Sequence, residues 1–140
     1  MTWKENVILK IGTHPMNRYA ERFLGLGSAC NLSIRARRYI WFEIERQIKD
    51  SFILTTGQLK RMKIRRKRRK ENGKTYYLAH VKRRRGQLFV NRIYVVGFKR
   101  LIGTSSYTLI VYTVFPPRVQ KIKNVRGGAF IQKIDVRRDN

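Results

Sequence analysis

The 140-residue sequence predicts an α+β domain, in which an N-terminal strand and two to three helices pack on an antiparallel β-meander sheet. Two observations lead to this class. Apolar residues recur at helical spacing between residues 13 and 50, whereas residues 74–115 are rich in the branched and aromatic residues that favour strands. We expect one domain over residues 1–117, with its helices on one sheet face, and a basic C-terminal extension over residues 118–140.

The first half is expected to begin with a strand and a helix. Val7–Ile11 is short and rich in branched residues, which is typical of a strand. Thr13 is expected to cap the helix that follows, Pro15 is tolerated in its first turn, and Gly25 and Gly27 end it. The stripe expected to be buried, at spacings of three and four residues, consists of Met16, Tyr19, Ala20 and Phe23.

Two more helices are expected before the main strands. Ser33 opens the longer one, which runs to about Asp50. Its expected apolar face consists of Ile34, Trp41, Ile44 and Ile48, opposite Arg35, Glu43 and Arg46. A short third helix is expected between Leu54 and Met62.

The second half is expected to form the meander. Its three strands cover residues 74–81, 87–98 and 107–115. Turn residues lie before and between them, at Asn72-Gly73, Arg85-Gly86 and Gly103–Ser106. Asn-Gly is the strongest of these hairpin signals, because both central residues of a type I′ turn need a positive φ. Pro116 ends the last strand, and a weak further strand is expected at residues 129–134.

The composition indicates a folded domain with a polyanionic partner. Lys and Arg number 33 against 8 Asp and Glu, so the formal charge is +25, yet 42% of the residues are hydrophobic and 11% are aromatic. A disordered basic tail has few aromatics, and a +25 chain resists compaction unless negative charge is nearby. Nucleic acid is favoured over an anionic membrane surface. With Cys30 alone and no signal peptide or membrane span evident, we expect a cytoplasmic or organelle-matrix protein.

Residues 60–85 carry half of the excess charge, with 14 basic side chains and one acidic. Clustered Lys and Arg neutralise phosphates, which predicts nucleic-acid binding; a localisation signal or a solvated face is the alternative. The expected contacts are Lys60, Arg61, Lys63, Arg65, Arg66, Lys67, Arg68, Arg69, Lys70, Lys82, Arg83, Arg84 and Arg85. If Asn72-Gly73 closes a hairpin, residues 60–70 form one arm of a basic β-ribbon. Tyr76, Tyr77 and Phe89 either stack on unpaired bases or pack within the sheet.

A candidate catalytic set lies on the polar face of the first helix. His14, Arg18, Glu21 and Arg22 are spaced by four, three and one residues, which places them on one face. Imidazole exchanges protons near neutral pH and guanidinium stabilises a pentavalent phosphate, so His14, Arg18 and Arg22 are candidate catalytic residues. The alternative is a solvated helix face on which Arg pairs with Glu21.

The strands add His80 and Thr113 as candidates, with Tyr112 beside Thr113; each is otherwise an ordinary sheet position. Alternation places Leu109, Val111, Thr113 and Phe115 on one face of the last strand and Ile110, Tyr112 and Val114 on the other. No Cys/His ligand set, phosphate-binding loop or carboxylate cluster is evident, so neither metal nor cofactor is expected. Cleavage of nucleic acid would then use the 2′-hydroxyl of RNA as the nucleophile.

Two segments resemble a known group of enzymes. Residues 13–23, THPMNRYAERF, resemble the entry helix of the RelE-like and barnase–EndoU–colicin-like ribonuclease toxins, and residues 108–116, TLIVYTVFP, resemble their closing strand. The resemblance covers about residues 7–117. It implies metal-independent cleavage of messenger or transfer RNA, with His14, Arg18 and Arg22 at the helix motif and Thr113 at the strand position. His80 has no counterpart in these motifs.

The expected function is therefore RNA binding by a metal-independent ribonuclease of the toxin type, with no cofactor. The expected partners are ribosomal, messenger or transfer RNA and an acidic neutralising protein, and no membrane. Two alternatives remain open at this stage. One is a ribosomal or other ribonucleoprotein component without catalysis, and the other is a DNA-binding protein of a mobile element that inserts the basic ribbon into the major groove.

Overall fold

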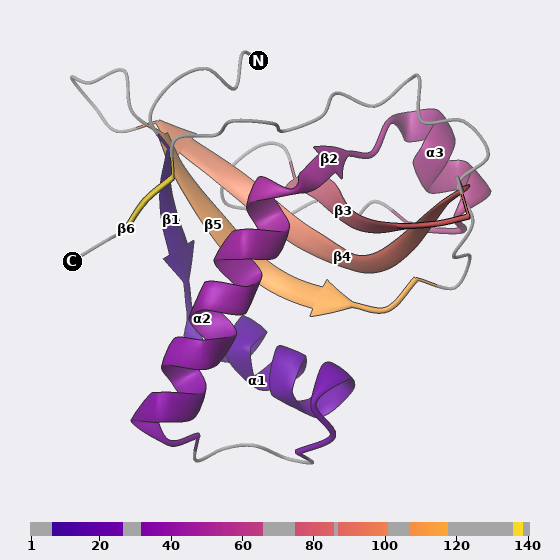
Figure 1. The fold of residues 1–140 in the computed structure, drawn as a ribbon. Coiled ribbons are helices and arrows are strands. Elements are labelled where there is room, and N and C mark those ends of the chain that lie inside the picture. Colours follow the sequence, from indigo (N-terminus) through magenta and orange to yellow (C-terminus); the bar gives the residue numbers. More distant parts are fainter. Residues whose placement is uncertain are drawn as a thin grey trace.

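A computed structural model describes residues 7–26, 32–65, 75–85, 87–100, 107–117 and 136–138. The elements in chain order are β1 (Val7–Ile11), α1 (Thr13–Phe23), α2 (Ile34–Lys49), β2 (Ser51–Ile53), α3 (Thr56–Arg61), β3 (Thr75–Arg84), β4 (Gln87–Arg100), β5 (Tyr107–Phe115) and β6 (Val136–Arg138). The predicted α+β class is confirmed (Figure 1). No helix in these ranges combines the length and the apolar character needed to cross a membrane.

The strands form one mixed sheet in the order β2-β3-β4-β5-β1-β6. Strands β2 to β5 are antiparallel neighbours, as a meander requires, but β1 pairs in parallel with both β5 and β6. Three residues of the expected C-terminal extension, Val136–Arg138, thus pair within the sheet. Strand β1 reaches only to the Ile11↔Val111 pair, so β5 continues beyond the end of β1.

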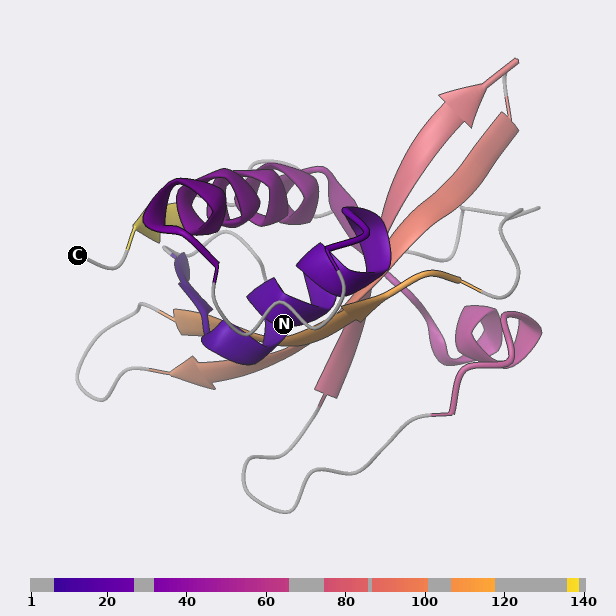
Figure 2. The same ribbon diagram turned by 90° about the horizontal axis from the view of Figure 1, so that it is seen from below.

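The sheet has an apolar core on each face, which corrects the expectation that all helices share one face. Helices α1 and α2 cover the first core, which includes Leu78, Tyr94 and Leu109. The short helix α3 covers the second, to which Leu59 and Met62 contribute from α3 and its C-cap. Figure 2 shows α1 and α2 together on one side of the sheet, with α3 apart from them.

Helices α1 and α2 follow their predicted patterns, with two corrections. Tyr19 and Ala20 are buried, and Met16 and Phe23 pack against the same core, as predicted. Gly12, and not Thr13, occupies the N-cap of α1, and no side chain caps that end. In α2, Ser33 does cap the helix, but Ile34 is 73% exposed, because it lies off the buried stripe of Ile40, Ile44, Gln47 and Ile48.

Strand β2 was not predicted from the sequence, and helix α3 is shorter than the 54–62 segment in which a helix was predicted. Ser51–Ile53 pairs antiparallel with β3, and Leu54 is a buried residue after the strand. Helix α3 starts at Thr56 because Thr55 and Gln58 form a capping box: each side chain accepts a hydrogen bond from the other residue's backbone N–H.

A β-bulge in β5 overturns the predicted alternation along that strand. Val95 pairs with Thr113, but Val96 pairs with Val111, so Tyr112 is the extra residue. An extra residue reverses the faces that follow it. Val114 therefore joins Leu109 and Val111 in the first core, whereas Tyr112 and Phe115 pack against the second.

Strands β3 and β4 form a ribbon that extends beyond their neighbours. In β3, only residues 78–80 pair with β2, and in β4 only the residues from Ile93 onward pair with β5. Residues 81–90 therefore pair only with each other in the described sheet. The ribbon closes where the turn was predicted, since Arg84 pairs with Gln87 and Arg85 has φ 50°.

The predicted ribbon arm at residues 60–70 is wrong where the structure describes it. Lys60 and Arg61 belong to α3, and residues 62–65 form a turn and an irregular segment. Several other predictions fall outside the described residues. They are the rest of the basic run, the turns at Asn72-Gly73 and Gly103–Ser106, Gly27, Cys30 and the weak strand at 129–134.

Candidate active site

A cavity of about 810 Å³ opens between α1, the segment after α3 and the second-core face of the sheet. Four of the five predicted catalytic residues line it: His14, Arg18, Arg22 and Thr113. The fifth, His80, does not line it. The other lining residues are Met62, Lys63, Ile64, Arg65, Thr75, Tyr77, Val95, Phe115 and Pro116.

Helix α1 reaches this cavity because β1 is shorter than β5. The chain leaves β1 at Ile11, turns at Gly12 and runs along the part of β5 that β1 does not cover. The apolar stripe of α1 faces the first core, so its opposite, polar face borders the cavity. Arg22 Nη1 donates a 2.6 Å hydrogen bond to the carbonyl oxygen of Val114, which joins α1 to this end of β5.

The bulge in β5 brings Thr113 to the same cavity. In the sheet register, Tyr77 pairs with Val95 and Val95 pairs with Thr113, so the three residues form one row across β3, β4 and β5. All three line the cavity. Bulges re-aim side chains in this way beside many functional sites.

The cavity lining is cationic and contains no Asp or Glu among the residues that the structure describes. Arg18 Nη1 forms a 3.0 Å ion pair with Glu21 Oε2, and both side chains are partly exposed. Such a pair is weak in water, so Arg18 can exchange Glu21 for a phosphate at small cost. Within the described ranges, no three His, Cys, Asp or Glu residues lie together as a metal site would require.

Lys63 lines the cavity from a strained backbone conformation. Its φ is 58°, in the left-handed region. The N–H of Lys63 donates to the carbonyl of Lys60, and the N–H of Ile64 donates to that of Leu59. This Schellman pairing ends many helices and usually places Gly where Lys63 stands. A residue with a side chain costs about 1 kcal/mol there, so this lysine is unfavourable for stability alone.

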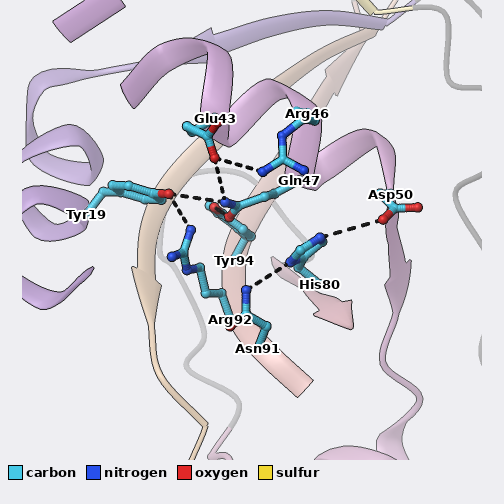
Figure 3. Close-up of polar contacts among 9 residues, drawn as sticks. All are labelled: Tyr19, Glu43, Arg46, Gln47, Asp50, His80, Asn91, Arg92 and Tyr94. Atoms are coloured by element: carbon cyan, nitrogen blue, oxygen red, sulfur yellow. Dashed lines mark hydrogen bonds and ion pairs between the residues drawn. The ribbon is translucent and has the colours of Figure 1, made fainter. Parts of the chain in front are cut away.

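A polar network behind α1 holds this helix to α2 and β4 (Figure 3). Gln47 is buried, and its Nε2 donates to the hydroxyl of Tyr19 at 3.1 Å, while the hydroxyl of Tyr94 donates to its Oε1. Arg92 donates to the same Tyr19 hydroxyl and stacks against the ring of Phe23 at 4.4 Å. Burial raises the pKa of both Tyr19 and Tyr94, so both hydroxyls stay protonated.

Replacing Gln47 is expected to destabilise the fold. Gln47→Leu keeps the volume but leaves the buried Tyr94 hydroxyl without its acceptor, so the free energy of unfolding should fall by about 1–3 kcal/mol. Urea titration measures the change. Arg38→Leu, at an exposed position of the same helix, should change it by less than about 0.5 kcal/mol. Equal effects of the two substitutions would contradict this role of the network.

His80 lies beside this network and does not line the cavity. It is buried on the α2 side of the sheet, where its Nδ1 lies 3.2 Å from Asn91 Nδ2 and its Nε2 lies 3.6 Å from Asp50 Oδ2. Burial lowers the pKa of His80, and the positive charges of Arg46, Arg92 and Lys82 act in the same direction, while Asp50 opposes them.

This lowered pKa predicts a loss of stability in mild acid. Below about pH 6.5 the unfolded chain binds a proton at His80 more readily than the folded chain does, so stability falls as the pH falls through that value. The chain has two histidines, so His14→Ala leaves His80 as its one histidine. Urea titrations of this variant over that range should show the decline, and His80→Gln should flatten it. A decline unchanged by His80→Gln would contradict the assignment.

The predicted nucleic-acid contacts divide into three groups. Lys63 and Arg65 line the cavity. Lys60 and Arg61 are exposed on α3, and Lys82, Arg84 and Arg85 are exposed on the ribbon. The structure does not describe the third group, which consists of the side chain of Arg83 and of Arg66, Lys67, Arg68, Arg69 and Lys70.

The aromatic candidates for base stacking mostly pack within the sheet. Tyr76 meets Phe98 edge to face at 5.5 Å beside the first core, and Tyr77 is buried in the second, where its hydroxyl donates to the carbonyl of Arg65. Sequence reasoning missed Ile64 and Phe115 as cavity residues, since nothing in their local pattern indicates that α3 and the bulged end of β5 meet.

In comparisons with known proteins, no protein-family model, no curated protein and no solved structure matches the chain.

Proposed function

We propose that this chain is a metal-independent RNA-cleaving enzyme that acts at the cavity beside α1. The observation that carries the proposal is that His14, Arg18 and Arg22 share one cavity with Thr113, which lies about 90 residues later in the sequence. Phosphate transesterification needs a proton-transfer group beside positive charges that neutralise the developing oxyanion. The resemblance of the α1 and β5 segments to RelE-like and barnase-like ribonucleases supports the same chemistry.

In the proposed reaction, one RNA phosphate lies between the guanidinium groups of Arg18 and Arg22. The 2′-hydroxyl oxygen attacks phosphorus and loses its proton, the P–O5′ bond breaks, and O5′ takes up a proton. His14 transfers one of these two protons and water transfers the other. The products are a 2′,3′-cyclic phosphate and a 5′-hydroxyl. Arg18 and Arg22 stabilise the pentavalent phosphate, and the hydroxyl of Thr113 donates to one of its oxygens.

Cations outside the cavity then hold the remainder of the RNA. The exposed residues of α3 and of the ribbon contribute Lys60, Arg61, Lys82, Arg84 and Arg85. Contacts of this kind fix the position of a nucleic acid without reading its sequence. Binding is therefore expected to weaken steeply as salt is raised, whereas the chemical step depends on the cavity.

The ribbon also favours a second candidate, a ribonucleoprotein component without catalysis. A two-stranded projection with Lys82, Arg84 and Arg85 exposed is suited to binding folded RNA whether or not the cavity is catalytic. This candidate predicts tight RNA binding and no turnover.

One experiment separates the two candidates. The purified protein is incubated in EDTA with a single-stranded RNA and with the same oligonucleotide made of 2′-deoxynucleotides. The enzyme proposal expects cleavage of the RNA, with many turnovers, and none of the DNA, which lacks the nucleophile. Binding of the RNA without cleavage would overturn it in favour of the non-catalytic candidate.

Lys63→Gly is expected to change stability and function in opposite directions. Glycine relieves the left-handed strain, so the free energy of unfolding should rise by about 0.5–1 kcal/mol. Loss of the ammonium at the cavity wall should weaken RNA binding several-fold. Urea titration and RNA titration measure the two effects. Lys99→Gly, at an exposed position of β4 outside the cavity, should lower stability instead, and a Lys63→Gly protein that binds RNA normally would refute the role of this lysine.

A further inference from the structure

The cavity has two chemically different walls. The α1 side and the segment after α3 supply cations, among them Arg18, Arg22 and Lys63. The sheet side and the end of α3, together with Ile64 after it, supply mostly apolar groups, among them Met62 and Phe115. Phosphate gains nothing from an apolar wall, so a ligand that contained only phosphate and sugar would leave half of the cavity unused.

The apolar wall has a buried layer of side chains and, over it, a partly exposed layer. Met62, Tyr77 and Val95 are buried members of the second core, whereas Ile64 and Phe115 are only partly buried and pack over them. The hydrogen bond from the Tyr77 hydroxyl to the carbonyl of Arg65 ties the segment after α3 to the sheet. The wall is thus held in place before a ligand arrives, and a flat aromatic ligand finds a preformed surface.

A nucleobase is the flat group that every RNA linkage carries beside its phosphate and ribose. A cavity of about 810 Å³ lies within the range of pockets that bind small molecules, so it has room for one nucleotide. In a duplex, both faces of each base are stacked and its edge is paired. Only an unpaired base offers a free face to Phe115 and Ile64.

We propose that the apolar wall formed by Ile64 and Phe115 is a nucleobase subsite, which restricts the enzyme to unpaired nucleotides. This inference rests on the proposed function, since it assigns the base that accompanies the phosphate at Arg18 and Arg22. The unpaired base lies against Phe115, the adjoining phosphate faces the α1 cations, and paired RNA is excluded because its bases are already stacked. Stacking on a protein aromatic is sequence-tolerant, so the subsite distinguishes unpaired from paired RNA and not one base from another.

The test compares two uncleavable RNA analogues with 2′-O-methyl riboses, one complete and one with a single abasic position, which carry the same charge. At raised salt, the wild-type protein should bind the complete strand about 10-fold more tightly than the abasic strand. Annealing a complementary strand should weaken binding at the cavity to a similar extent. Phe115→Ala should remove the preference for the complete strand. Phe98→Ala, a matched loss of a partly buried ring on the opposite face, should keep it.

The outcomes for the subsite and for catalysis are separable. Equal binding of the complete and abasic strands, or a preference that survives in Phe115→Ala, would overturn the subsite even if RNA is cleaved in EDTA. A preference that depends on Phe115, in a protein that cleaves nothing, would support the subsite and remove the proposed function.

Discussion

His14→Ala is expected to reduce RNA cleavage by about 100- to 10,000-fold, the range over which one positioned proton-transfer group acts. His14 is exposed near the start of α1 and lines the cavity beside Arg18. Because its side chain contributes to neither core, the substitution should leave the free energy of unfolding at neutral pH nearly unchanged. RNA affinity should also change little, since the cations remain. Single-turnover cleavage in EDTA, with a parallel binding titration, measures these effects.

Asn17→Ala provides the matched control for His14→Ala. Asn17 lies one turn further along α1 and does not line the cavity, so its loss should leave cleavage within a few-fold of the wild type. Added imidazole should restore part of the rate to His14→Ala, because it can occupy the space of the missing ring and carry the proton. A His14→Ala protein that cleaves at the wild-type rate would remove His14 from the mechanism.

Arg18→Ala is expected to lower the cleavage rate by about 100- to 1,000-fold, comparable to the loss of one donor that stabilises a transition-state oxyanion. The substitution has a second consequence, since it leaves Glu21 without the ion pair seen at 3.0 Å. An unpaired carboxylate next to the cavity would repel the phosphate. Arg18→Ala combined with Glu21→Gln should therefore recover part of the lost RNA affinity while the cleavage rate stays low.

Arg38→Ala is the control for charge alone, because Arg38 is exposed on α2, outside the cavity. It removes the same formal charge from the same kind of element. The affinity for RNA should fall slightly, and the cleavage rate at saturating RNA should stay the same. Equal losses in Arg18→Ala and Arg38→Ala would mean that net charge, and not the cavity, controls the reaction.

Local patterns in the sequence predict α1 and its polar face well. The stripe that contains Tyr19 and Ala20 has a clear helical period, and a helix that buries this stripe must present His14, Arg18 and Arg22 together on its other side. Thr113 is found by its resemblance to a motif, but alternation assigns it to the wrong group of residues, because the bulge at Tyr112 comes from pairing with β4 and leaves no local signal.

The second wall of the cavity depends on long-range pairing that no local pattern contains. Strand β2 is three residues long and gains its partner from β3, which in turn places α3 over the second core. The parallel pairing of β1 with β5, and the early end of β1, decide where α1 crosses the sheet edge. The capping box at Thr55 and Gln58 is the one feature of this region that has a local sequence signature, a Thr followed three residues later by a Gln.

The chemistry of the RNA ends tests the central claim most directly. A short RNA is cleaved by the wild-type protein in EDTA, and the products are separated and identified by mass. Attack by the 2′-hydroxyl at the α1 cavity predicts a 2′,3′-cyclic phosphate on one fragment and a 5′-hydroxyl on the other, both absent with His14→Ala. Fragments that carry a 3′-hydroxyl and a 5′-phosphate, or cyclic-phosphate products that persist undiminished in His14→Ala, would contradict it.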